Sequence, residues 1–117
     1  MKEKEQILKQ LDDIEFHDVP VEKISFKTEN TTDFIIDFAL YQEREENYDY
    51  WTLKFIDIKE LESGRLELNP ESDLEIYSLD YKLNKQFDCK ILFLLGFGQS
   101  SYEIILKCEK IELNKTD

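Results

Sequence analysis

Residues that interrupt regular structure are scarce in this sequence. Its 117 residues include only three glycines and two prolines, and neither type gathers into a linker-like tract. The longest apolar run, Ile91–Leu95, has five residues, far short of the roughly 20 that a membrane-spanning helix needs. The charged N-terminal residues are not followed by an apolar leader segment. We therefore expect one cytoplasmic domain over residues 1–117 that does not enter a membrane.

Residue types that commonly carry chemistry are also few. The only histidine is His17, and the two cysteines, Cys89 and Cys108, lie in apolar segments where a buried reduced thiol is typical. A zinc site would need more ligands than these. The sequence has no nucleophile motif and no glycine-rich phosphate loop. We predict no catalytic residue, no metal, no cofactor and no enzymatic activity.

Positive charge is the third shortage. Fifteen Lys and Arg face 27 Asp and Glu, for a net charge of −12. Nucleic acids require a basic surface, so this balance excludes a general nucleic-acid binder and disfavours docking on anionic lipid. Residues 29–80 hold fifteen acids and four bases, whereas both flanks are close to neutral. An acidic region of this kind would attract a basic partner; the alternative is that it only keeps the protein in solution.

The first residues have helical periodicity. Ile7, Leu8, Leu11 and Ile14 recur at the spacing of one helix face, among Lys, Glu, Gln and Asp. This pattern predicts an amphipathic helix over residues 2–15.

From Val21 onward the apolar period changes to two, which predicts β-strands with polar turns between them. The apolar parity slips near Phe55–Ile56, where a β-bulge would restore it, and it slips again between Ile76 and Leu79 and between Cys108 and Ile111. We expect an α+β, mainly β fold, with a β-region at 19–113 and a frayed tail at 114–117. Its six or seven strands would form an antiparallel meander, as a curved sheet, a sandwich or an open barrel. The predicted strands lie near residues 21–27, 34–41, 50–58, 66–68, 74–83, 87–97 and 102–113.

Acidic residues and tyrosines cluster together between two of these strands. Tyrosine is favoured at protein interfaces because a rigid apolar ring there has a polar tip. The neighbouring Trp51 shares the parity of Leu53 and Phe55, which favours a core position, while Tyr50 has the opposite parity. The alternatives for the acidic residues are a solvated loop, an acid/base pair of carboxylates or a hard-cation site, although the calcium-loop spacing is absent. The predicted partner-binding residues are Tyr41, Glu43, Glu45, Glu46, Tyr48, Asp49 and Tyr50.

His17 and Asp18 form the one pair that suggests acid–base chemistry. An adjacent carboxylate can orient a histidine and raise its pKa. Successive residues of a strand point to opposite faces, so Asp18 need not orient His17, and a structural role where the helix meets the first strand is the favoured interpretation.

Three segments carry a resemblance to a known group of proteins. The run His17–Phe26, HDVPVEKISF, resembles the opening of small bacterial β-rich domains in which a His-Asp pair precedes the first strand. The aromatic-aliphatic strand Trp51–Ile58 and the closing strand Tyr102–Leu113, with its Cys-x-x-Ile ending, are similar as well. That group includes immunity-like proteins of polymorphic toxin systems. The resemblance implies a non-enzymatic protein that binds and blocks a cognate toxin, and it transfers no catalytic residue.

Two functions of different classes remain open from the sequence. The first is a protein-binding domain that uses an acidic, tyrosine-containing surface to block a basic protein partner. The second is a small-ligand-binding or enzymatic β-barrel with His17 in or near its pocket. A homo-oligomer built by pairing of edge strands is a third possibility.

Overall fold

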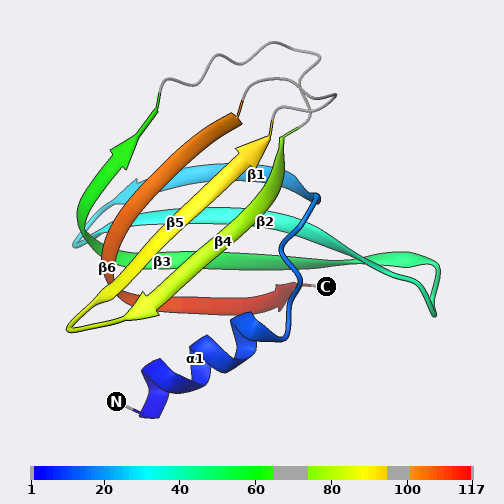
Figure 1. Ribbon diagram of the computed structural model, residues 1–117, viewed down its shortest axis with the longest axis horizontal. Helices are drawn as coiled ribbons and strands as arrows, with labels where there is room; N and C mark the ends of the chain where they lie inside the picture. The colour runs from blue at the N-terminus through cyan, green and yellow to red at the C-terminus, as the bar shows by residue number, and fades with distance from the viewer. Residues whose placement is uncertain (1, 65–73, 95–100, 117) are drawn as a thin grey trace.

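The computed structural model describes residues 2–64, 74–94 and 101–116. It confirms the predicted fold class, because one N-terminal helix precedes antiparallel strands that form a single sheet (Figure 1). The predicted strand at 66–68 and the end of the predicted strand at 95–97 lie outside the described residues. The elements are α1 (Lys2–Asp12), β1 (Val19–Thr28), β2 (Thr32–Gln42), β3 (Asn47–Ser63), β4 (Glu75–Leu83), β5 (Phe87–Leu94) and β6 (Ser101–Thr116).

The sheet closes into a barrel with the strand order β1-β2-β3-β6-β5-β4. Neighbours in sequence pair as hairpins, except that β3 pairs with β6 rather than with β4. The strand order therefore differs from that of a sequential meander. The barrel is closed where β1 meets β4, and among the residues that the structure describes the pairs there are Val19↔Ile76 and Pro20↔Glu75. This short pairing, called the seam below, also includes a hydrogen bond of 2.9 Å from the Val21 amide to the Leu74 carbonyl.

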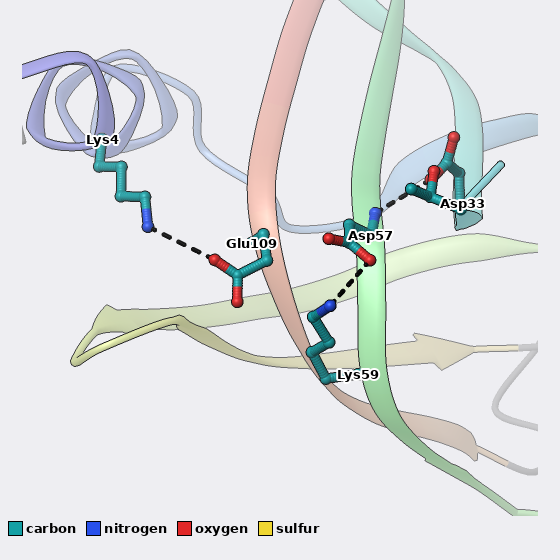
Figure 2. A network of polar contacts seen from close by, with 6 residues as sticks. Lys4, Asp33, Asp57, Lys59 and Glu109 are labelled. Atoms are coloured by element: carbon teal, nitrogen blue, oxygen red, sulfur yellow. Dashed lines mark hydrogen bonds and ion pairs between the residues drawn. The ribbon is translucent and has the colours of Figure 1, made fainter.

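Bulges keep the apolar side chains of the long strands inside the barrel, as the parity slips predict. In β3 the pairing register shifts between Ile58 and Glu60, slightly later than expected, and Asp57 has a positive φ of 59°. Asp33, at the start of β2, contacts the backbone of β3 beside this bulge. Its Oδ1 accepts a hydrogen bond of 3.0 Å from the Asp57 amide (Figure 2). The Asp57 carboxylate pairs in turn with Lys59 at 3.2 Å. In β4 the register shifts between Ile76 and Ser78.

Aromatic and aliphatic side chains that point inward form the core of the barrel. Alternate residues of β2, β3, β5 and β6 are fully buried, which is what alternation on a closed sheet requires. One cluster joins these strands to the apolar face of α1. The largest fully buried side chains of the strands are Phe34, Phe38, Phe55, Phe87, Phe93, Ile36, Leu53, Ile76, Ile91, Ile104 and Leu106.

The helix lies across one end of the barrel and contributes Ile7 and Leu11 to the core (Figure 1). It ends at Asp12, before the predicted end at Glu15. Beyond the helix, Phe16 is buried against Phe38, with ring centroids 5.5 Å apart. The Tyr81 hydroxyl of β4 donates a hydrogen bond to Asp12, and burial and this carboxylate raise the pKa of Tyr81. Among the described residues, no helix is both long and apolar enough to cross a membrane.

The last strand extends further than the sequence indicates. Residues 114–116, predicted as a frayed tail, belong to β6 and pair with β3. Lys115 lies opposite Trp51 and Thr116 lies opposite Tyr50. The Thr116 hydroxyl also donates a hydrogen bond of 3.1 Å to the Tyr50 carbonyl. The C-terminal part of β6 therefore supports the acidic, tyrosine-rich segment of β3.

Candidate functional site

Residues 41–50 form a two-stranded arm that extends beyond the barrel (Figure 1). The pairing of β1 with β2 stops at Phe38, and the pairing of β6 with β3 stops at Tyr50. Further out, β2 and β3 pair only with each other, as far as Gln42↔Asn47. At the root of the arm the Thr52 hydroxyl donates a hydrogen bond of 2.7 Å to Asp37. Long strands thus present the predicted partner-binding residues on a projecting ribbon.

The three tyrosines of the arm share its outer face. Phe38 on β2 and Trp51 on β3 turn toward the core, so by alternation Tyr41, Tyr48 and Tyr50 turn away from it. Tyr41 and Tyr48 are directly opposite each other, with ring centroids 5.2 Å apart and an interplanar angle of 66°. The exposed fractions are 53%, 47% and 48% for Tyr41, Tyr48 and Tyr50. Trp51 is partly buried against the core, as its parity predicts.

The carboxylates of the predicted site divide into two groups. Glu43, Glu45 and Glu46 are exposed in the turn, and Glu46 has a positive φ of 52°. No ion pair within the described parts of the chain includes any of these three. Asp49, by contrast, alternates with Tyr48 and Tyr50 and lies on the other face, where Lys115 approaches its carboxylate to 3.4 Å. Asp49 is therefore neutralised by the protein itself and separated from the tyrosine face.

Sequence reasoning did not identify Lys115 as part of this region. The residue was assigned to a frayed tail because Asn114–Asp117 has no apolar alternation. Its partner Asp49 is far away in sequence, and only the pairing of β3 with β6 brings the two together. The one available signal was the parity of Ile111 and Leu113, which continues to Lys115 if the strand is extended.

His17 and Asp18 lie beside the seam. The His17 Nε2 atom is 3.3 Å from the Asp18 carboxylate, and its ring is tilted against Tyr77, with centroids 4.9 Å apart. The φ of 55° at Asp18 departs from extended strand geometry, in which neighbouring side chains point to opposite faces, and the two side chains lie close together here. The His17 side chain is 53% exposed. It lies next to the closing strands and does not belong to the buried cluster inside the barrel.

The two cysteines are free and buried, as predicted. Two main effects raise the pKa of Cys89 well above its ordinary value: the larger is a hydrogen bond with Cys108, and the smaller is burial of the thiol. The thiolate is the reactive form of cysteine, so neither burial nor this shift favours a nucleophilic role. Across residues 2–64, 74–94 and 101–116, no group of three or more His, Cys, Asp or Glu is placed to hold a metal ion.

Comparison with known proteins gives no relative: no family model, no curated protein and no solved structure matches the chain. The arm is therefore the structural feature from which a function is inferred.

Proposed function

We propose that this protein is a non-enzymatic binding domain that docks a basic protein partner on its arm, in the manner of an immunity-type inhibitor that blocks a toxin. The observation that carries the proposal is the outer face of the arm. Three half-exposed tyrosines lie there next to an exposed turn with three glutamates. The proposed place of action is the cytoplasm, where free buried cysteines remain reduced.

The tyrosines supply the contact energy in this proposal. A tyrosine ring brings a large apolar area and a hydrogen-bonding tip at a small cost in conformational entropy, and this makes it a frequent hot-spot residue. Tyr41 and Tyr48 already touch edge to face, so their positions are largely set before a partner arrives. Such preorganisation lowers the entropic cost of binding.

In this proposal the negative charge of the acidic region raises the rate of association with a basic partner and disfavours acidic proteins. Residues 29–80, which include the whole arm, hold fifteen acids and four bases. Acidic surfaces accelerate the encounter with basic ones and repel acidic competitors. A narrow ribbon that projects from a barrel has a shape suited to the basic groove of a nucleic-acid-cleaving toxin, where it would exclude the substrate.

The geometry gives less support to a ligand-binding or enzymatic barrel. That function needs a lined cavity with His17 or a carboxylate directed into it. The inward side chains of the barrel are instead fully buried phenylalanines and aliphatic residues in one packed cluster. His17 is half exposed beside the seam.

An affinity experiment with matched variants tests the proposal. The tagged protein and its Tyr41→Ala/Tyr48→Ala variant would be incubated with lysate of the native host, and captured proteins would be identified by mass spectrometry. The purified candidate would then be mixed with each form and analysed by size-exclusion chromatography. We expect a basic protein that forms a 1:1 complex with the wild type and loses at least tenfold in affinity with the arm variant.

Tyr77→Ala is the control, because Tyr77 is 40% exposed but lies beside the seam. It should retain the partner, and circular dichroism should show that all forms are folded. A partner that is held equally by the wild type and the arm variant would contradict the proposal.

A further inference from the structure

The arm has features that distinguish between the two kinds of basic side chain that a partner can offer. We infer that it recognises arginine in preference to lysine, by stacking the guanidinium group on the tyrosine face while the glutamates of the turn accept its N–H groups. This inference rests on the proposed function and specifies the chemistry of the partner.

The arrangement of the rings provides the stacking surface. Tyr41 and Tyr48 meet at 66°, so the edge of one ring contacts the other and both rings keep exposed surface. Tyr50, on the same outer face, extends the aromatic surface toward the barrel. A guanidinium group is planar and weakly hydrated and stacks on aromatic faces, whereas an ammonium group is compact and strongly hydrated.

The turn provides acceptors next to these rings. Glu43, Glu45 and Glu46 are exposed and form no ion pair with the described residues of the chain. A guanidinium can stack through its face and still donate from its edge, often to both oxygens of one carboxylate. An ammonium group approaches as a point charge and cannot make both contacts with the same directionality. The combination of rings and carboxylates therefore favours arginine.

Asp49 marks the limit of this recognition surface. Its carboxylate already pairs with Lys115 on the opposite face of the arm. The tyrosine face and the turn, rather than the total number of acids in the arm, should accordingly determine selectivity.

Two peptide probes test the inference on the full chain. Fluorescein-labelled nona-arginine and nona-lysine carry the same charge, and their binding would be followed by fluorescence anisotropy at about 50 and 200 mM NaCl. We expect nona-arginine to bind about two- to fivefold more tightly, since one additional cation–π contact at an exposed site is worth about that factor. The difference should persist at the higher salt concentration, although both affinities fall.

Variants separate stacking from charge. Tyr48→Phe keeps the ring and should keep the preference for arginine, while Tyr48→Leu should reduce nona-arginine binding toward the nona-lysine value. Tyr77→Leu should change neither. Equal affinities of the wild type for the two peptides, or a preference that survives Tyr48→Leu, would overturn the inference. The proposed function has its own test: it would be contradicted if a basic host partner bound the Tyr41→Ala/Tyr48→Ala variant as tightly as the wild type.

Discussion

Three acidic residues occupy the left-handed backbone region that normally favours glycine or asparagine. They are Asp18, Glu46 and Asp57, with φ values of 55°, 52° and 59°. Two of them have an evident structural role. Asp57 donates its amide to Asp33 at the bulge of β3, and Asp18 contacts His17 beside the seam. Glu46 lies in the exposed turn of the arm, and its side chain makes no ion pair with other described residues.

The conformation of Glu46 leads to a stability prediction. A side chain with a Cβ atom costs about 1 kcal/mol in the left-handed region, and glycine avoids this cost. Glu46→Gly should therefore raise the free energy of unfolding by about 0.5–1 kcal/mol. Urea denaturation, followed by fluorescence of Trp51, measures the shift in midpoint.

Glu45→Gly is the matched control, because Glu45 lies in the same turn and is not among the described residues with positive φ. Glycine there adds freedom to the unfolded chain and relieves no strain, so we expect no gain in stability. Equal midpoints for the two variants would show that the left-handed conformation of Glu46 costs nothing. If the carboxylate of Glu46 serves binding, the gain in stability should be accompanied by weaker binding of nona-arginine.

For the helix and the strands, features that depend on neighbouring residues were predicted better than features that depend on distant contacts. The alternation of apolar residues identified the described strands, and the parity slip of β3 predicted its bulge, since both depend only on neighbouring residues. The parity slip of β4 coincides with its register shift between Ile76 and Ser78. The same parity placed Trp51 against the core and Tyr50 outside. The end of the helix at Asp12 was less predictable, because no glycine marks it and the residues that follow pack against distant ones, as Phe16 does against Phe38.

Two leucines of α1 should contribute unequally to the stability of the protein. Leu11 is fully buried and Leu8 is only partly buried, although both lie on the apolar face of α1. Leu11→Ala should lower the free energy of unfolding by about 2–5 kcal/mol, the range for buried leucines that leave a cavity. Leu8→Ala should cost clearly less. Thermal denaturation followed by circular dichroism measures both. Equal losses would contradict the deeper burial of Leu11 in the contact between α1 and the barrel.

For the whole molecule, strand order and the position of the arm were beyond local reasoning. The pairing of β3 with β6 joins Tyr50 to Thr116 and Ser63 to Ile104, residues that no short pattern connects. This pairing joins the first three strands to the last three and also places Lys115 beside Asp49. The structure places the seven predicted partner-binding residues on the arm, and strand alternation alone separates Asp49 from the tyrosine face. The ion pair of Asp49 with Lys115 could not be predicted, because it depends on the pairing of β6 with β3.

The unequal strand pairings around the barrel predict where it opens first. The pairing of β3 with β6 extends from Tyr50 to Ser63, whereas in the described part of the chain the seam holds β1 to β4 by two residue pairs and the hydrogen bond of the Val21 amide. Native-state hydrogen exchange should therefore show that the Val21 amide opens at a lower free energy than the slowest amides of β3 and β6. Those amides should exchange only through global unfolding. Mild denaturant should accelerate exchange in the central pair and leave exchange at the seam nearly unchanged, because local opening exposes little surface. Equal protection at both places would mean that the short seam opens only when the entire barrel unfolds.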